Sequence, residues 1–333
     1  MGSTAVPVPE LAGRPAPGFE HVACVYGSDQ EFLEMAVPFL EKGLSAGRPV
    51  LAVTTASNLE LIGAALGRHG IDVDYAESAF FGRRPPQRIA AFHRYWQQRC
   101  GAGGSSVRIL AEPVWGGRPA RDITAWTRME AGLNVTLADT TISMVCPYDS
   151  RSVDPAIIAA ARATHPAQIG GTRTAPSPDY ADPADFARGC DAAPLPGPPE
   201  SAAAHHFTGN LRGLRQFIAV RAAAYDLPPQ RAGLLVQAAA EAATYLKNQA
   251  GGTAAVRTWE EPGAVVCDFR QERAPAPDPF LGLRPAELRP RAGDGLWLAA
   301  QICERADIRA VDGTTIIRLQ VPTRRNQEAA FAA

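Results

Sequence analysis

The chain has 333 residues, of which 46% are hydrophobic, so it is long enough to bury a core in each of two domains. Its 33 Lys and Arg residues and 34 Asp and Glu residues leave a formal charge of -1, which excludes a global electrostatic attraction to nucleic acid or to an anionic membrane. No apolar run approaches the roughly 20 residues that span a bilayer, and residues 1–15 lack the basic start and apolar core of a signal peptide, so we expect a cytoplasmic protein.

Residues 18–170 alternate short β-branched runs with longer helical patterns. The helix DPAIIAAARATHP begins with Asp154 in a capping position and Pro155 at the first helical position. Steady alternation of strand and helix predicts parallel strands joined by right-handed crossovers, and hence a doubly wound α/β domain. The predicted strands are HVACVYG, PVLAVTT, VDYAES, VRILAEP and TISMVCPYD.

Residues 171–203 are rich in Pro, Ala and Asp and show no period, which predicts a semi-extended linker. Two helical patterns follow, at 210–227 and 228–248. A further helix, GLWLAAQICERA, precedes the last of three strand-like runs. Helices against a mostly antiparallel sheet predict an α+β sandwich, followed by a solvated tail at 323–333. The strand-like runs are AAVRTWEE, AVVCDFRQE and DIRAVDGTTIIRLQV.

The first domain has candidate ligand-binding residues at the ends of its strands, where doubly wound sheets bind ligands. Each candidate also has a structural interpretation: Trp115 as a cover of the sheet edge, Arg118 and Glu130 as an ion pair, and His165 as the end of a helix. No P-loop motif is present, so nucleotide hydrolysis is not expected in this domain. The candidates are Glu112, Trp115, Arg118, Glu130, Asn134, Tyr148, Asp149 and His165.

The six cysteines are scattered, without a CxxC or a Cys/His cluster at metal spacing, so we expect reduced thiols and no metal site. One alternative is a thiol or small-molecule sensor whose second domain only dimerises. Another is a hydrolase triad of Cys146, His165 and Asp149, although nothing places Cys146 on a nucleophile elbow.

Residues 204–321 resemble the GHKL ATPase fold in the order of their motifs: EAATYLKN at the end of a helix, GDGLWLA at a helix start, and DGTT before a closing strand. More narrowly, they resemble the serine-kinase type of bacterial anti-sigma factor. The resemblance implies that Glu241 takes the position of a general base. It also implies that Gly293, Gly295 and Thr314 lie around a phosphate site, where a helix N-terminus offers free N–H groups.

Three positions depart from that family. Tyr245 stands where an Asn binds magnesium, Gln271 where an Asp binds adenine, and Arg273 where a Gly gives the base room. A protonated phenol is a poor ligand for magnesium, which prefers carboxylate, carbonyl or water oxygens. Neither ATP nor magnesium is therefore expected as a cofactor, although Gln271 and the two glycines could form a residual nucleotide site, and Glu241 is expected to be vestigial.

Residues 18–187 resemble the MEDS sensory domain that precedes kinase-like domains in many actinobacterial regulators. The resemblance implies a RecA-like α/β core without catalysis, which senses a small molecule or a partner. The matching segments are HVACVYGSDQEFLEMAVPFLEKGLSAGRPVL, AEPVWGGR, RMEAGLN, CPYDSRSVD, the HP pair at 165–166 and SPDYADPADF.

Together these features predict an anti-sigma type regulator, with a sensor at 18–170, a linker at 171–203 and a degenerate GHKL domain at 204–322. The implied partner is a sigma factor or an anti-anti-sigma protein, with a possible homodimer and no direct contact with nucleic acid or membrane. The alternative is an active, ATP- and magnesium-dependent serine kinase that phosphorylates an anti-anti-sigma factor.

Overall fold

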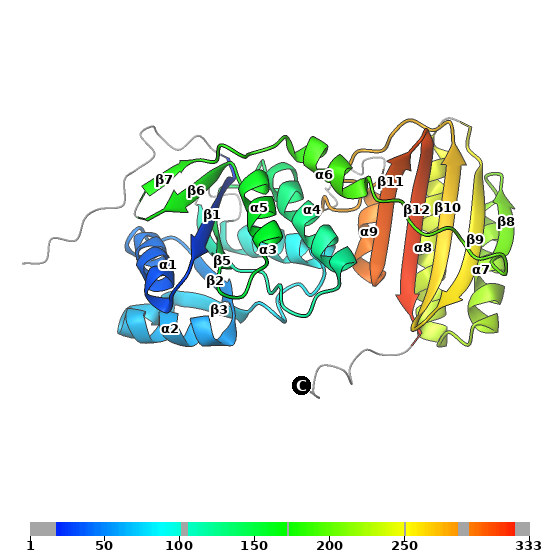
Figure 1. Cartoon of the computed structure of the whole chain (residues 1–333). Helices are drawn as coiled ribbons and strands as arrows, with labels where there is room; N and C mark the ends of the chain where they lie inside the picture. The colour runs from blue at the N-terminus through cyan, green and yellow to red at the C-terminus, as the bar shows by residue number, and fades with distance from the viewer. Residues whose placement is uncertain (1–17, 101–105, 172, 250, 286–292, 324–333) are drawn as a thin grey trace, which may run out of the picture. The chain divides into compact units, whose positions relative to one another are not determined.

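The computed structural model of the chain describes residues 18–100, 106–171, 173–249, 251–285 and 293–323 (Figure 1). It divides into two compact units, Met1–Ala187 and Arg188–Ala333. The start of the chain at 1–15 and the predicted tail beyond 323 lie outside the described residues. None of the described helices combines the length and the apolar character needed to cross a bilayer.

The first unit is built on a seven-stranded sheet of order β3-β2-β4-β5-β1-β6-β7, in which every pair is parallel except β6 with β7. Its strands are β1 (Glu20–Tyr26), β2 (Val50–Thr54), β3 (Val73–Glu77), β4 (Val107–Ala111), β5 (Ile142–Asp149), β6 (Ala167–Gly170) and β7 (Arg173–Pro176). The helices between them are α1 (Asp29–Ser45), α2 (Ala56–Leu66) with the 3-10 turn η1 (Gly67–Asp72), α3 (Pro85–Cys100), α4 (Ala120–Thr136) and α5 (Pro155–Thr164).

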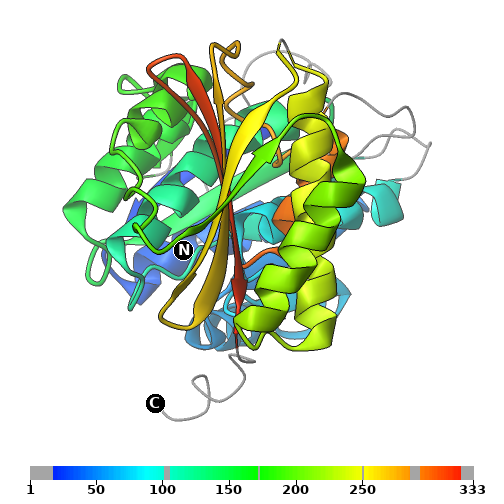
Figure 2. The same ribbon diagram turned by 90° about the vertical axis from the view of Figure 1, so that its right-hand side faces the viewer.

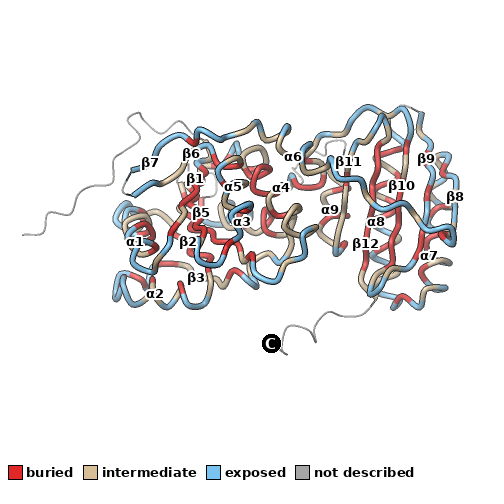
Figure 3. Tube along the Cα trace, in the orientation of Figure 1, coloured by how far each residue is buried: buried red, intermediate tan, exposed pale blue. Residues whose placement is uncertain are grey.

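The predicted alternation of strands and helices from β1 to α5 is confirmed. Asp154 caps α5 as expected, since its Oδ1 accepts from the N–H of Ala156 at 2.7 Å. The sheet is mostly parallel, as right-handed crossovers require, and its central strands are buried (Figure 3).

The two faces of this sheet carry different side chains, because successive residues of a strand point to opposite sides. One face presents Cys24, Tyr26 and Val145 to a core that they share with α1 and α2. The other presents His21 and Cys146, which approach Glu130 of α4.

The stretch 171–203, predicted as a linker, contains regular structure at its start. The strand β7 pairs with β6, and α6 (Pro183–Asp191) begins after Asp182, whose Oδ1 accepts from the N–H groups of Ala184 and Asp185. These elements are short, with four residues in β7 and nine in α6, which is little sequence from which to predict them.

The second unit is built on a five-stranded sheet of order β11-β12-β10-β9-β8, in which all pairs are antiparallel. The predicted antiparallel sheet is therefore confirmed. Helices α7 and α8 lie side by side along one face (Figure 2), and α9 packs against α8. The elements are β8 (Ala203–Phe207), α7 (Leu211–Ala224), α8 (Pro229–Lys247), β9 (Ala254–Glu261), β10 (Ala264–Glu272), α9 (Asp294–Ile302), β11 (Arg305–Val311) and β12 (Thr314–Pro322).

The run DIRAVDGTTIIRLQV, predicted as one strand, is a hairpin of β11 and β12. Asp312 and Gly313 form its turn with φ values of 48° and 75°. Two consecutive left-handed residues suit the two-residue turns whose twist matches paired strands, and Asp-Gly is a preferred sequence for them. The strand β8, which begins at the last residue of the predicted linker and lies mostly in the predicted second domain, was also not expected.

The face of this sheet opposite the helices holds a buried ion pair. Oδ1 of Asp268 accepts from Nε of Arg318 at 2.8 Å, and its Oδ2 accepts from Nε of Arg270 at 2.8 Å. The side chains of Asp268 and Arg318 are 0% and 1% exposed, and Arg318 also lies over the ring of Trp259. A charged pair this deeply buried must stay paired, because an unpaired charge in a protein interior is strongly destabilising.

Candidate functional site

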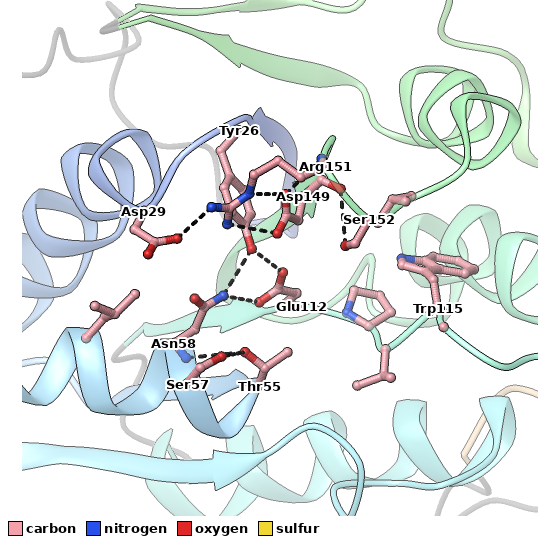
Figure 4. Close-up of a pocket in the computed structure, with 15 residues that line it drawn as sticks. Tyr26, Asp29, Thr55, Ser57, Asn58, Glu112, Trp115, Asp149, Arg151 and Ser152 are labelled. Atoms are coloured by element: carbon pink, nitrogen blue, oxygen red, sulfur yellow. Dashed lines mark hydrogen bonds and ion pairs between the residues drawn. The ribbon is translucent and has the colours of Figure 1, made fainter.

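A pocket of about 260 Å³ opens at the carboxyl ends of four neighbouring strands of the first unit (Figure 4). The chain runs from β1 through β2 to β3 at one edge of the sheet and then returns through β4 and β5. Ligands of parallel sheets bind where the strand order reverses in this way. The volume lies just below the about 300–1,000 Å³ of drug-sized sites, so the pocket suits a small ligand.

Glu112, the residue after β4, is the buried polar centre of this pocket and is 5% exposed. Its Oε1 accepts from the hydroxyl of Tyr26 at 2.7 Å, and its Oε2 accepts from Nδ2 of Asn58 at 2.8 Å and from the hydroxyl of Thr54. Burial and the adjacent carboxylate raise the pKa of Tyr26, so its phenol stays protonated and donates. One carboxylate thus joins the ends of β1 and β2, the start of α2 and the loop after β4.

An ion-paired arginine lies at the pocket rim. Nε and Nη2 of Arg151 donate to the two carboxylate oxygens of Asp149 at 2.8 and 2.9 Å, and its Nη1 lies 2.9 Å from Oδ1 of Asp29. These hydrogen bonds hold the pKa of Asp149 below its usual range. The rim therefore carries two carboxylates and one guanidinium.

Trp115 supplies an apolar wall on the opposite side of the pocket (Figure 4) and is 6% exposed. Its ring lies 6.1 Å from that of Tyr148, which in turn meets the imidazole of His165 edge-on at 5.8 Å. A contiguous row of aromatic rings therefore runs from the pocket wall into the core.

A buried polar cluster at the end of this row contains His21, Glu130, Cys146 and His165. One side-chain atom of each lies within 4.8 Å of the others, so these four could hold a metal ion. Oε2 of Glu130 is 3.5 Å from Nε2 of His21 and 3.8 Å from Nε2 of His165, and Sγ of Cys146 is 3.4 Å from Nε2 of His21. Asn134, one turn after Glu130, places its Oδ1 3.1 Å from Nδ1 of His21.

Complete burial determines the protonation of this cluster. It lowers the pKa of His21 and of His165 to about 3, so both imidazoles are neutral at physiological pH. It also raises the pKa of Glu130 and of the Cys146 thiol, although the charge of Arg88 opposes both shifts. Cys146 is therefore protonated and a poor nucleophile when no cation is bound.

We expect the stability of the protein to fall in mild acid because of these histidines. Between pH 6.5 and about 3 the unfolded chain binds protons that buried His21 and His165 exclude, so the free energy of unfolding decreases as the pH falls through this window. Each imidazole should lower the free energy of unfolding by about 2 kcal/mol between pH 7 and 5. The raised pKa of Glu130 offsets part of this decrease.

Urea denaturation at the two pH values, with EDTA in both buffers, measures the effect. His69→Gln, a change at an exposed position, should leave the loss intact, whereas His21→Gln should reduce it. Equal stability at pH 7 and 5 would show that these imidazoles are not held neutral.

Residues 20–166, from β1 to the end of α5, match the family model of MEDS, the MEthanogen/methylotroph, DcmR Sensory domain. The first unit carries a MEDS sensory domain. This assigns a signal-sensing role to the part of the chain that contains both the pocket and the buried cluster. No curated protein matches the chain.

Three of the candidate residues line the pocket of the MEDS domain: Glu112, Trp115 and Asp149. Glu130, Asn134, Tyr148 and His165 belong to the buried cluster and the row of rings beside it. Arg118 joins neither, because its guanidinium lies 4.0 Å from the ring of Trp126 and its Nε donates to the carbonyl of Val114. Arg118 and Glu130 do not form the ion pair considered from the sequence, since Glu130 faces Arg88 and two imidazoles.

The Cys146, His165, Asp149 triad is not assembled. Cys146 and His165 are neighbours in the cluster, but the carboxylate of Asp149 is bound by Arg151 at the pocket rim. All six cysteines are described, and none of them forms a disulfide in this structure.

In the second unit, Glu241 and the first turn of α9 are in direct contact. A Cβ added at Gly295 would overlap the carboxylate of Glu241, and one added at Gly293 would overlap the side chain of Leu281 and approach the ring of Tyr245. Oε1 of Glu241 also accepts from Nε2 of Gln237 at 2.6 Å. A carboxylate is favourable beside a helix N-terminus, so the contact of Glu241 with Gly295 stabilises this end of α9.

Gln271 is buried and fixed by backbone contacts. Its Nε2 donates to the carbonyl oxygens of Leu246 and Thr253 at 3.2 and 3.1 Å, which joins the end of α8 to the start of β9. Thr314 lies directly after the Asp312–Gly313 turn, as the first residue of β12, where it pairs with Val311. Both residues thus have structural roles in the sheet.

Arg273 is exposed and has a φ of 55°, in the left-handed region that favours glycine. We therefore expect Arg273→Gly to raise the free energy of unfolding of the full chain by about 0.5–1 kcal/mol, measured by urea denaturation. Arg257→Gly is the matched control, because Arg257 is exposed on the regular strand β9 and glycine weakens a strand interior. The same sign of effect for both variants would contradict the argument from backbone strain.

Proposed function

We propose that the chain is a regulator that binds a small-molecule signal in the strand-end pocket of its MEDS domain and a protein partner through its second unit. The observation that carries the proposal is the pocket itself: a buried carboxylate at Glu112, a rim of ionised groups and an aromatic wall, all at the strand ends of a sensory domain.

The pocket selects a small ligand with a hydrogen-bond donor and a short apolar part. Its charged acceptors are the carboxylates of Glu112, Asp29 and Asp149, and the hydroxyls of Thr55 and Ser57 can both accept and donate. Arg151 is engaged by the rim carboxylates, so it offers little to an anion. Small alcohols and amines fit this lining better than carboxylic acids do.

The proposal assigns a RecA-like core to the first unit and a GHKL-type fold to the second. The mostly parallel sheet supports the first assignment. The order of α7, α8, the strand pair, α9 and the closing hairpin, with the helices on one face of an antiparallel sheet, supports the second. On that basis the partner is a sigma factor or an anti-anti-sigma protein.

The second unit acts by binding rather than by phosphoryl transfer. Glu241 packs against Gly295, near which the resemblance to GHKL proteins implies a phosphate, so we expect its carboxylate to disfavour an anion there. Tyr245 replaces the magnesium ligand, and burial raises the pKa of its phenol, which keeps it protonated. Phosphoryl transfer needs the metal as well as the base.

Titration of the full chain with a non-hydrolysable ATP analogue, with and without magnesium, tests this reading of the second unit. We expect no binding at micromolar concentrations in either condition. Micromolar, magnesium-dependent binding would overturn the proposal and favour an active serine kinase. The ligand competence of the MEDS pocket is measured separately, so the two halves of the proposal can fail independently.

A further inference from the structure

The buried cluster of the MEDS domain has the composition of a metal site. It offers two imidazole nitrogens, one thiol and one carboxylate, from β1, α4, β5 and the residue directly after α5. All four side chains are 3% exposed or less. Mixed nitrogen, sulfur and oxygen ligands in sets of four are typical of zinc.

The distances in the cluster match a tetrahedral site. Zinc bonds of about 2.0–2.3 Å place neighbouring ligand atoms of a tetrahedron about 3.3–3.8 Å apart. Glu130 Oε2 lies 3.5 Å from His21 Nε2 and 3.8 Å from His165 Nε2, and Cys146 Sγ lies 3.4 Å from His21 Nε2. Three edges of the tetrahedron are therefore already present, and no ligand atom is more than 4.8 Å from another.

The groups behind the two histidines fix the tautomer that a metal requires. Nδ1 of His165 lies 2.7 Å from the carbonyl oxygen of Ala161, which can only accept, so Nδ1 carries the proton. Nδ1 of His21 faces Oδ1 of Asn134, whose Nδ2 donates to the carbonyl of Thr164 at 2.7 Å and thereby orients the amide. Both Nε2 lone pairs consequently point into the cluster, as in metal-binding histidines that donate their other N–H to an acceptor behind them.

The cluster contains more acceptors than donors. Oε2 of Glu130 and Nε2 of His165 are buried and have no hydrogen-bond partner among the described residues. Without a metal, the Cys146 thiol can donate to Nε2 of His21, which lies 3.4 Å from its sulfur. One divalent cation takes the place of the thiol proton and accepts both Nε2 lone pairs, and the thiolate and the Glu130 carboxylate balance its charge.

A neighbouring cation does not compete for these ligands. Arg88 is fully buried, and its guanidinium donates to the carbonyl oxygens of Ser78, Phe81 and Glu112 and to the hydroxyl of Ser78. Its hydrogen bonds are therefore made to groups outside the cluster, and Glu130 is left to face the two imidazoles.

We propose that His21, Glu130, Cys146 and His165 bind one Zn²⁺ ion in the core of the MEDS domain. Binding forms four coordinate bonds and releases to solvent the thiol proton of Cys146 and any proton that Glu130 carries, with no change in oxidation state. The ion joins two strands and two helices beneath the pocket, and the row of Tyr148 and Trp115 connects it to the pocket wall. This site is distinct from the ligand pocket, so it goes beyond the proposed function.

Metal binding by the full chain, after dialysis against EDTA, tests the proposal. We expect one equivalent of Zn²⁺ per chain by elemental analysis. Co²⁺ should occupy the same site and give a thiolate-to-cobalt charge-transfer band together with the d–d bands of tetrahedral cobalt. Absence of both bands in the wild-type protein would overturn the proposal without recourse to any variant.

Two cysteine variants locate the site. Cys146→Ala should weaken Zn²⁺ binding by at least about 100-fold and abolish the charge-transfer band, because changes behind a metal ligand already cost 10–100-fold. Cys24→Ala is the matched control, since Cys24 is a buried thiol on the adjacent strand but faces α1 and α2. This variant should keep the Zn²⁺ affinity and the charge-transfer band of the wild-type protein.

The thermal transition of each variant in EDTA shows whether it is folded. Equal Zn²⁺ affinity in folded Cys146→Ala and Cys24→Ala would overturn the assignment. If Cys146→Ala does not fold, Asn134→Ala replaces it. That change removes the acceptor behind His21 and should weaken Zn²⁺ binding by about 10–100-fold, whereas unchanged affinity would contradict the site.

Discussion

Replacing Asp268 by alanine should lower the free energy of unfolding of the second unit by about 3–5 kcal/mol. The carboxylate is 0% exposed and accepts from Arg318, which is 1% exposed, so its removal leaves a guanidinium buried without a counter-charge. The cost is that of the uncompensated charge and is larger than the net contribution of the pair. Arg270 is partly exposed, so the loss of its carboxylate partner costs less free energy, because solvent can replace that partner.

Urea denaturation of the full chain, followed by the signal of the second unit, measures this loss. Arg284→Ala is the control, since it breaks a pair with Asp278 in which both side chains are 43% exposed. Exposed pairs contribute about 0–1 kcal/mol. Similar losses for the two variants would mean that Asp268 is not buried with Arg318.

Replacing Glu112 by alanine should destabilise the MEDS domain by about 3 kcal/mol or more. Its carboxylate accepts from Thr54, Tyr26 and Asn58, all of which are less than 10% exposed, and each buried donor left without a partner costs about 1–3 kcal/mol. Some of this loss is recovered because Asn58 still donates to the Tyr26 hydroxyl.

Chemical denaturation of the Glu112→Ala variant measures the loss against that of Glu34→Ala. Glu34 is a helix residue whose carboxylate accepts an exposed hydrogen bond from Gln30, so its removal should change stability by less than about 0.5 kcal/mol. A loss for Glu112→Ala no larger than this would show that Glu112 is solvated rather than the centre of a buried network.

Much of the fold follows from sequence pattern alone. Long strands and helices with a clear hydrophobic period, such as β5 and α8, have the predicted type and nearly the predicted bounds. Among the elements that were missed, β6 and β7 have four residues each, and neither has a buried residue. The strand β6 pairs with β1, and β7 pairs with β6, and local sequence does not record these partners.

The candidate site was predicted only in part, for a related reason. The rule that ligands bind at strand ends found Glu112, Trp115 and Asp149, because each follows or ends a predicted strand. It did not find Tyr26, although this residue ends β1, because its hydroxyl gains a role only when β4 brings Glu112 beside it. Asn58 was also missed, since the residue lies inside the helix that follows β2.

The buried cluster shows the limit of reasoning from local spacing. No metal site was expected because no two ligands are close in sequence, yet the fold brings residues 21, 130, 146 and 165 together. Strand alternation places His21 and Cys146 on one face of the sheet, but their adjacency follows from the β1–β5 pairing, in which Ala23 lies opposite Cys146. A parallel pairing of strands as distant in sequence as those of Glu20 and Ser143 is not visible in either strand alone.

Ligand-observed NMR on the full chain, with small alcohols, amines and carboxylates of matched carbon number, tests most directly whether the MEDS pocket binds the signal. We predict that alcohols or amines bind in preference to carboxylates, that Glu112→Gln weakens this binding at least about 10-fold, and that Glu34→Gln does not change it. Preference for carboxylates, equal binding to both variants, or no binding to the wild-type protein would contradict the assignment of the strand-end pocket as the sensory site.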